Sequence, residues 1–205
     1  KLNNNNVYFI KIKHMGKSLE NKFIDYIDEV SNNLDYLKEN LFEEIEQTIN
    51  YIKNSLNSGG KIIFFGNGGS ASDSQHLCAE FVGRYKKNRD PLPAISLNTD
   101  TSILTAVAND MGYEKVFERQ VQALAKKEDV LIAISTSGKS KNVINAVTTG
   151  KKKGVKIISL TGKNESELTS LSDVSIKVPS DKVNHIQEMH ILVGHFICEM
   201  IENDI

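Results

Sequence analysis

The chain has 205 residues, of which 40% are hydrophobic and 25% charged, and its formal net charge at pH 7 is −1. These values are ordinary for a globular domain that buries a substantial core. A near-neutral charge gives no basis for binding nucleic acid or an anionic membrane surface. No apolar run approaches the ~18 residues of a spanning helix. We therefore expect no nucleic acid and no membrane among its partners.

The cysteines and the first residues bear on where the protein is found. Cys78 and Cys198 lie in separate helical patterns, which predicts buried thiols in a reducing compartment rather than a disulfide framework. Nothing resembles a signal peptide, so we expect a cytoplasmic protein. Residues 1–14 contain an asparagine run and end at a junction typical of expression vectors. We expect them to be a tag or disordered leader, and residues 15–205 to form a single domain.

A helical segment covers residues 19–58 and carries two apolar stripes at helical spacing. The first consists of Phe23, Tyr26, Ile27 and Val30, and the second of Leu37, Leu41, Ile45, Ile49 and Ile52. Ser31-Asn32-Asn33 is a weak break between two helices, and Ser58-Gly59-Gly60 ends the second. We expect their exposed apolar surface to pack against other subunits.

Strands and helices alternate through the rest of the chain. Strands are expected at Ile62–Gly66, Ala94–Asn98, Val130–Ile134, Val155–Leu160 and Val174–Val178. After the helix that follows the first strand, further helices are expected at Thr101–Asn109, Tyr113–Lys126, Ser140–Lys153, Glu165–Leu171 and His185–Glu202. This alternation implies parallel crossovers, and it predicts an α/β three-layer sandwich with a central parallel sheet, preceded by two N-terminal helices.

Two loops of small and hydroxylated residues follow buried strands and open helices. The first is Asn67–Ser72, and the second is Ser135-Thr136-Ser137-Gly138-Lys139-Ser140. Backbone N–H groups at such a helix start bind anions, and the helix dipole favours negative charge. Because both loops follow strands of one sheet, we expect them to meet in a crevice where a phosphate binds.

The helix after the first loop carries a candidate chemical pair. His76 and Glu80 stand one turn apart on one face, as a base or metal-ligand pair would; a solvated helix face is the alternative. The loop also matches the dinucleotide pattern G-x-G-x-x-A through Gly66, Gly68 and Ala71. That pattern expects an acidic residue about 20 positions on, whereas Asp100 comes late, so a dinucleotide is the weaker interpretation.

These motifs together resemble the phosphoheptose isomerases, whose sugar isomerase (SIS) domain is flavodoxin-like. The likeness runs from about Leu19 to Glu202 and is carried by Asn67-Gly68-Gly69-Ser70-Ala71, Gln75-His76, Glu80-Phe81, Asn109-Asp110, Ser135-Thr136-Ser137-Gly138, Leu160-Thr161-Gly162 and Ile186-Gln187-Glu188. It implies conversion of sedoheptulose 7-phosphate to D-glycero-D-manno-heptose 7-phosphate through an enediol. It also implies a role in nucleotide-activated heptose biosynthesis for lipopolysaccharide or capsule.

The resemblance also implies roles for individual residues. Glu80 and His195 would be the catalytic acid–base groups, and one zinc ion per subunit would be bound by His76, Glu80, Gln187 and His195. Substrate would be bound by Asn67, Gly68, Gly69, Ser70, Arg84, Asn109, Asp110, Ser135, Thr136, Ser137, Ser140 and Gln187. A homotetramer with sites at subunit interfaces is the implied assembly.

Several alternatives stay open on the last helix. At 100° per residue, both His190 and His195 can share a face with Gln187, and Glu188 also competes. We expect His190 to be structural and His185 to lie on the surface. Asn184-His185 stand where many relatives have Asp-Arg, which leaves contacts from these two positions in question. The alternative functions are a non-catalytic SIS protein that binds the replication initiator, and an isomerase of another sugar phosphate.

Overall fold

The computed structural model describes residues 18–204 of the chain. Within this range five strands form one sheet, in the order β2-β1-β3-β4-β5, and all neighbours are parallel. The strands are β1 (Ile62–Gly66), β2 (Ala94–Ser96), β3 (Val130–Ile134), β4 (Lys156–Thr161) and β5 (Val174–Lys177). The predicted parallel sheet is confirmed; the second strand is two residues shorter than expected.

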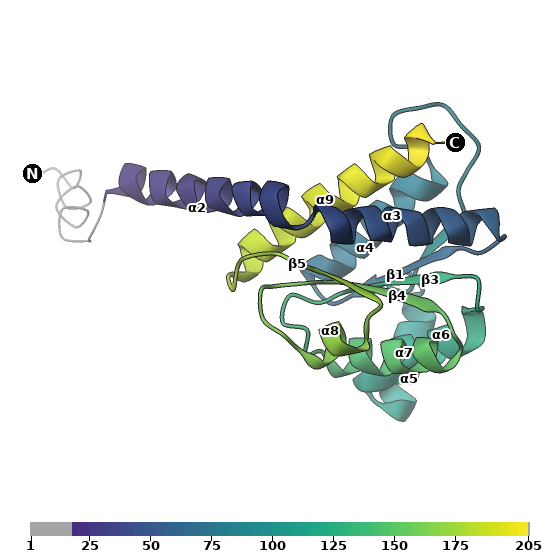
Figure 1. Cartoon of the computed structure of the whole chain (residues 1–205). Coiled ribbons are helices and arrows are strands. Elements are labelled where there is room, and N and C mark those ends of the chain that lie inside the picture. Colours follow the sequence, from purple (N-terminus) through teal and green to yellow (C-terminus); the bar gives the residue numbers. More distant parts are fainter. Residues whose placement is uncertain (1–17, 205) are drawn as a thin grey trace, which may run out of the picture.

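Helices cover both faces of the sheet and make the three layers visible in Figure 1. One face carries α3 (Phe42–Asn57), α4 (Gly69–Val82) and α9 (Val183–Asn203). Helix α2 (Leu19–Asn40) comes directly before α3 in the chain. The other carries α5 (Thr101–Met111), the 3₁₀ turn η1 (Tyr113–Lys115), α6 (Val116–Leu124), α7 (Lys141–Lys152) and α8 (Glu167–Leu171). The expected three-layer sandwich is therefore confirmed.

The continuous apolar strands supply two separate cores, because successive side chains of a strand point to opposite faces. In β1, Ile62 and Phe64 pack beneath α3, α4 and α9, whereas Ile63 and Phe65 pack against α6 and α7. All four side chains are almost completely buried. Burial of one such side chain contributes about 1.5–3 kcal/mol. The sheet is thereby fixed between two helical layers, and the loops at its carboxyl edge start from a rigid base.

The predicted break at Ser31-Asn32-Asn33 is wrong. Helix α2 runs through this segment without interruption and ends at Asn40, since no glycine or proline is present to stop it. The break lies at Leu41, which has a φ of −115° and a ψ of 12° and is 4% exposed. The chain turns where the Leu41 side chain enters the core beneath α9.

The strand order places the two polar loops side by side. The chain moves from β1 outward to β2 and then crosses back to β3 on the other side of β1. In a sheet of this order, ligands bind outside the carboxyl ends of the strands where the direction of winding reverses. The loops after β1 and β3 flank this switch point, which is where the sequence predicts the crevice.

None of the helices among residues 18–204 has the length and apolar character needed to cross a membrane. Both cysteines are free thiols, with Cys198 buried and Cys78 partly buried. Burial raises the pKa of Cys198 to about 12, helped by the nearby carboxylate of Glu80. The Cys198 thiol therefore stays protonated and packs as a small apolar side chain. The expected tag or leader at residues 1–14 lies outside the described residues.

Candidate active site

The loop after β1 makes a tight entry into α4 that depends on glycine. Gly68 has a φ of 56° and a ψ of −121°, a conformation that L side chains rarely adopt. At Gly69 an added Cβ would come 2.4 Å from the amide nitrogen of Gln187 on α9. These two residues let the first turn of α4 approach α9 closely, and Gln187 lines the same cavity as Asn67–Ser70.

Three side chains with metal-binding or acid–base capacity converge beyond this loop. His76 and Glu80 come from one face of α4, with His76 Nε2 lying 3.3 Å from a Glu80 carboxylate oxygen. His195 of α9 brings its Nε2 to 2.9 Å from His76 Nε2. One ligand atom from each of the three lies within 4.8 Å of the other two. A set of two imidazoles and one carboxylate fits a divalent metal such as zinc.

The approach of α9 to α4 depends on Gly194, the residue before His195. A Cβ at this position would come 2.6 Å from both methyl carbons of Leu77, the residue after His76. Leu77 is 3% exposed and packs in the core beneath α9, so it has little room to move. A larger residue at position 194 would therefore separate the two histidines. The sequence reasoning did not single out Gly194.

Asp73 lies one helical turn before His76 on α4, and it too escaped the sequence reasoning. Burial raises the pKa of the Asp73 carboxyl to about 6, opposed by the charge of His76. Its Oδ2 atom is buried and has no hydrogen-bond partner among the described residues. The carboxyl group therefore lies partly buried one turn before His76, on the same helix. The spacing of three residues between Asp73 and His76, which puts both on one face of a helix, is the sequence feature that could have indicated it.

The Asn67 side chain is held by a pair of amide hydrogen bonds. Asn67 Nδ2 donates to Asn142 Oδ1 at 2.9 Å, and Asn142 Nδ2 donates to Asn67 Oδ1 at 2.8 Å. The Tyr113 hydroxyl also donates to Asn67 Oδ1, at 3.0 Å. These contacts join the loop after β1 to the first turn of α7 and to η1. Neither Asn142 nor Tyr113 stood out in the sequence, because neither belongs to a loop motif.

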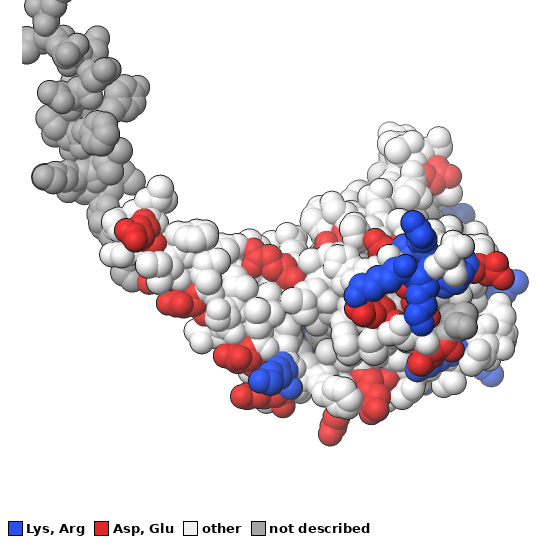
Figure 2. All heavy atoms as spheres, turned by 90° about the horizontal axis from the view of Figure 1, so that it is seen from above, with Lys and Arg blue, Asp and Glu red and all other residues white. Residues whose placement is uncertain are grey.

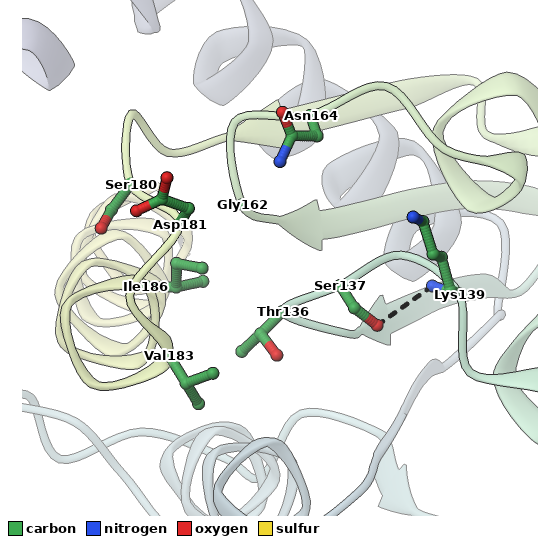
Figure 3. A pocket seen from close by; sticks show the side chains of 9 residues that line it. All are labelled: Thr136, Ser137, Lys139, Gly162, Asn164, Ser180, Asp181, Val183 and Ile186. Carbon is green, nitrogen blue, oxygen red and sulfur yellow. Dashed lines mark hydrogen bonds between the residues drawn. The ribbon is translucent and has the colours of Figure 1, made fainter.

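The loop after β3 contributes hydroxyl groups to two adjoining cavities. Ser135, Thr136 and Ser140 line a cavity of about 240 Å³ together with Asn67–Ser70 and Gln187. The Ser135 and Ser140 hydroxyl oxygens lie 3.2 Å apart there. Ser137 and Lys139 line a second cavity of about 240 Å³, shown in Figure 3. Thr136 and Val183 line both, so the structure divides the predicted phosphate loop between two neighbouring cavities.

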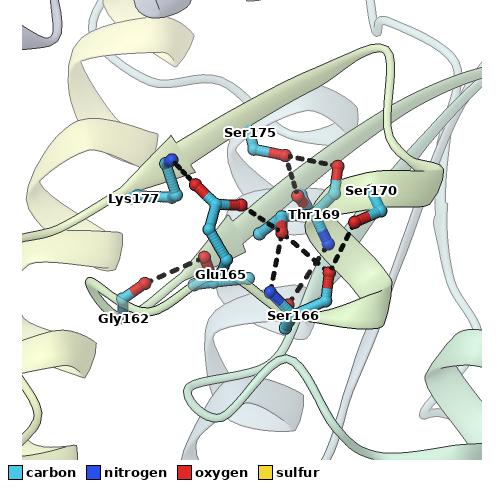
Figure 4. Close-up of polar contacts among 9 residues, drawn as sticks. Gly162, Glu165, Ser166, Thr169, Ser170, Ser175 and Lys177 are labelled. Atoms are coloured by element: carbon cyan, nitrogen blue, oxygen red, sulfur yellow. Dashed lines mark hydrogen bonds and ion pairs between the residues drawn. The ribbon is translucent and has the colours of Figure 1, made fainter.

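Helix α8 supports this loop from behind. Gly138 has a φ of 63°, and a Cβ on it would lie 2.1 Å from the Ser166 hydroxyl oxygen. Ser166 and Thr169 form a reciprocal capping box at the start of α8, part of the network in Figure 4. Glu165 extends the network, because it accepts a hydrogen bond from Thr169 and pairs with Lys177 on β5. The packing of Ser166 against Gly138 thus links the loop to α8 and, through Glu165 and Lys177, to β5.

Other predicted substrate-binding residues lie away from these cavities in the single chain. Arg84 is exposed, and none of the hydrogen bonds or ion pairs within residues 18–204 involves it. Asn109 and Asp110 are exposed near the end of α5, where the Asn109 amide donates to the Asp110 carboxylate at 2.8 Å. Neither Asn109 nor Asp110 lines either cavity. Their predicted contacts with substrate stay predictions.

The remaining histidines of α9 are both buried. His190 is fully buried and hydrogen-bonded through Nε2 to the backbone carbonyl of Thr161 at 3.1 Å, as a structural residue would be. The prediction that His185 lies on the surface is wrong, since His185 is 2% exposed. Its ring lies between the carboxylates of Glu188 at 2.9 Å and Glu29 at 3.0 Å, because α2 packs over the start of α9.

Comparisons with known proteins agree with this geometry. The SIS domain family model matches residues 25–162. A phosphoheptose isomerase from Helicobacter pylori (strain P12) is 55% identical over 164 residues, covering 80% of this chain and 85% of the relative.

Solved structures of phosphoheptose isomerases from Neisseria gonorrhoeae and Francisella tularensis have TM-scores of 0.85 and 0.88, at 38% and 33% identity. Each comparison covers 91% of this chain and 100% of the other. These relatives are at least 33% identical to this chain, and each comparison covers most of both chains. The chain therefore belongs to the phosphoheptose isomerase family of SIS-domain proteins.

Proposed function

We propose that this protein is an aldose–ketose isomerase that converts sedoheptulose 7-phosphate to D-glycero-D-manno-heptose 7-phosphate. The observation that carries the proposal is the meeting of Glu80 and His195, with His76, on α4 and α9, the two helices whose N-terminal parts line a cavity together with both polar loops. The family's activity and this constellation point to the same chemistry. The presence of all three side chains argues against a non-catalytic protein of the same fold. The product would enter nucleotide-activated heptose biosynthesis for lipopolysaccharide or capsule.

The reaction moves a proton between C1 and C2 of the sugar through an enediol. Glu80 takes the proton from one carbon and returns it to the other, and His195 moves the proton between the two oxygens. Because the two groups come from different helices, they can face different atoms of the same substrate. The side chain of Glu80 is 21% exposed, so it is partly sheltered from solvent.

The donor atoms fit one zinc ion per subunit. His76, Glu80 and His195 would hold it, with Gln187 as the fourth ligand. When bound, zinc would polarise the sugar oxygens as a Lewis acid. Gln187 packs against Gly69 at the edge of the cavity, which supports a role at the junction of metal and sugar.

The phosphate would be bound by the loop that opens α7. Ser135, Thr136, Ser137 and Ser140 provide hydroxyl and backbone donors, and the dipole of a twelve-residue helix favours the negative charge. Asn67, Gly68, Gly69 and Ser70 would line the sugar. Arg84, Asn109 and Asp110 would add contacts if these residues reach a neighbouring subunit's cavity, as the interface location of the sites requires.

We also propose a cytoplasmic homotetramer in which residues 15–205 act as one SIS domain. Helix α2 projects from the body, and Leu19, Phe23 and Ile27 on it are 85%, 65% and 44% exposed. In Figure 2 the part of the molecule next to the grey residues is α2, and its surface there is mostly uncharged or acidic. So much exposed apolar surface on one helix supports burial against other subunits.

The proposal is tested by incubating the protein with sedoheptulose 7-phosphate and following the sugar by NMR, with and without a chelator. The heptose 7-phosphate should appear, and the chelator should slow its formation. Fructose 6-phosphate and ribulose 5-phosphate serve as controls for the sugar. Absence of heptose 7-phosphate with the metal-loaded protein would contradict the proposal, and faster turnover of a control sugar would reassign the substrate.

A further inference from the structure

A buried ion pair lies behind the candidate active site, outside the set of residues considered so far. Arg89 follows α4, and Glu202 is two turns beyond His195 on α9. Arg89 Nε lies 3.1 Å from a Glu202 carboxylate oxygen, and their side chains are 9% and 2% exposed. A charge pair buried to this degree is costly unless its remaining hydrogen bonds are also satisfied. The other hydrogen-bond partners of Arg89 and Glu202 therefore show which segments this ion pair holds together.

Arg89 binds the end of the helix that carries Glu80. Its Nη2 donates to the backbone carbonyl of Glu80 at 2.8 Å, and its Nη1 donates to that of Phe81 at 2.9 Å. The last carbonyls of a helix lack intrahelical partners. The forked guanidinium thus caps the last turn of α4 and holds the backbone of Glu80 directly. A lysine ammonium lacks this rigid fork, which spans the two carbonyls and Glu202 at once.

Glu202 gathers the loop after α4 around its carboxylate. It accepts backbone hydrogen bonds from Tyr85 at 2.9 Å, Lys86 at 2.6 Å and Lys87 at 2.8 Å. Burial alone would raise the pKa of Glu202, but these bonds and the charge of Arg89 lower it to about 2. The group is therefore ionised at neutral pH. The backbone N–H of Tyr85 is held by Glu202, and the centroid of the Tyr85 ring lies 5.6 Å from that of the His195 ring.

We propose that the Arg89–Glu202 pair is a positioning device that sets Glu80 and His195 relative to each other, without touching the substrate. One member holds the backbone of Glu80. The other belongs to the helix of His195 and fixes the tyrosine that packs on the His195 ring. Since a misplacement of about 1 Å can cost 100-fold in rate, loss of this pair should lower turnover more than it lowers substrate binding.

The test compares Glu202→Gln and Arg89→Lys with a matched control. Asp129 is also a buried carboxylate, 1% exposed on its side chain, paired with Lys61 and bonded to the backbone N–H groups of Lys61 and Lys126. It lies just before β3, and its hydrogen-bond partners Lys61 and Lys126 belong to neither α4 nor α9. Asp129→Asn therefore removes a similar network without reaching α4 or α9. Arg89→Lys keeps the charge opposite Glu202 and loses the double contact with α4.

Two readouts separate positioning from stability. The kinetic readout rests on the proposed isomerase activity: Glu202→Gln and Arg89→Lys should lower kcat about 10-fold or more, with KM changed by no more than about twofold. The second readout is independent of turnover, because Zn²⁺ affinity of the metal-free protein should weaken about 10-fold or more in both variants. Asp129→Asn should lower Tm about as much as Glu202→Gln does, but it should leave kcat and Zn²⁺ affinity unchanged.

Arg89→Lys decides the matter if Glu202→Gln does not fold. Normal kcat and normal Zn²⁺ affinity in a folded Arg89→Lys variant would overturn the proposal. So would an equal loss of both in Asp129→Asn, which would make the effect one of general stability. If the wild-type protein does not turn over sedoheptulose 7-phosphate, the proposed function fails, while the Zn²⁺ affinities still test the positioning role.

Discussion

The Nε2 atoms of His76 and His195 lie 2.9 Å apart, although the two residues are separated by more than half of the chain. Neutral imidazoles that face each other in this way must share a proton or direct their lone pairs to a common cation. Glu80 lies beside them and supplies a negative charge. The three side chains offer the donor types of a divalent metal site, and the proposed zinc ion rests on this arrangement.

Removing one of these imidazoles should therefore remove the metal. We expect His195→Ala to lose its bound Zn²⁺, since a ligand atom is missing, and to lose about 10²–10⁴-fold in kcat, since it also loses an acid–base group. Metal content by mass spectrometry and turnover with added Zn²⁺ are the measurements. His190→Ala is the control, because His190 is buried away from the cluster and should keep its metal. Full metal content in His195→Ala would rule out the ligand assignment.

The hydroxyl groups of the loop after β3 should control substrate binding rather than turnover. A hydrogen bond to a charged group contributes about 1.5–3 kcal/mol, so Ser140→Ala and Ser137→Ala should each raise KM about 10–100-fold. Ser137→Glu should nearly abolish binding by charge repulsion. Ser170→Ala is the control, because this exposed hydroxyl lines neither cavity and, within residues 18–204, donates only to the carbonyl of Ser166, the N-cap of α8. An unchanged KM in Ser137→Ala alone would place the phosphate in the cavity of Ser140.

His190 should make stability depend on pH. Burial lowers its pKa to about 4, only partly offset by the hydrogen bond to Thr161, whereas the unfolded value is 6.5. Between these values the unfolded chain binds more protons, so stability is fully present above pH 6.5 and falls as pH drops toward 4. The loss is on the order of 3 kcal/mol. The free energy of unfolding, measured with denaturant at fixed protein concentration, should fall less between pH 7.5 and pH 4.5 in His190→Gln than in the wild-type protein. An equal fall in both proteins would contradict this prediction.

The apolar stripe of α2 should hold the assembly together. Phe23 is 65% exposed in the single chain, and burying a charge in its place at an interface would be costly. We expect Phe23→Glu to convert a tetramer into smaller species at micromolar concentration, measured by light scattering. Asn21→Glu places the same charge about 160° around the helix and should leave the tetramer intact. A wild-type monomer, or a Phe23→Glu tetramer, would contradict the proposed assembly.

Local patterns in the sequence were enough for much of the fold. β1 and β3 have the predicted bounds, because their apolar runs are bounded by glycine and serine loops. His76, Glu80 and His195, three of the four ligands that the family resemblance implies, also lie together, while zinc binding and the role of Gln187 stay predictions. These features depend on residues adjacent in sequence or on a motif shared by relatives.

What the sequence did not reveal depends on packing between distant segments. His185 was expected on the surface because nothing near it in sequence covers it, yet α2 brings Glu29 to its ring. Gly194 resembles any helical glycine until Leu77 of α4 is placed against it. The capping of Glu80 by Arg89 likewise requires the loop after α4 to fold back over α9. No periodicity or motif encodes such contacts.

The central claim is that Glu80 carries a proton between C1 and C2 of the sugar. Glu80→Gln keeps the size of the side chain and an oxygen near His76, but it removes the base, so kcat should fall about 10²–10⁴-fold. Gln75→Glu, on the exposed face of α4, is a folded control that should keep normal turnover.

The most direct measurement is turnover of sedoheptulose 7-phosphate in deuterated water, with deuterium at C1 and C2 followed by NMR. Proton transfer through an enediol predicts deuterium at the carbon that receives the proton in the wild-type product, and little exchange with Glu80→Gln. Wild-type product free of deuterium, together with normal kcat in Glu80→Gln, would contradict the assignment and indicate a hydride shift between the two carbons.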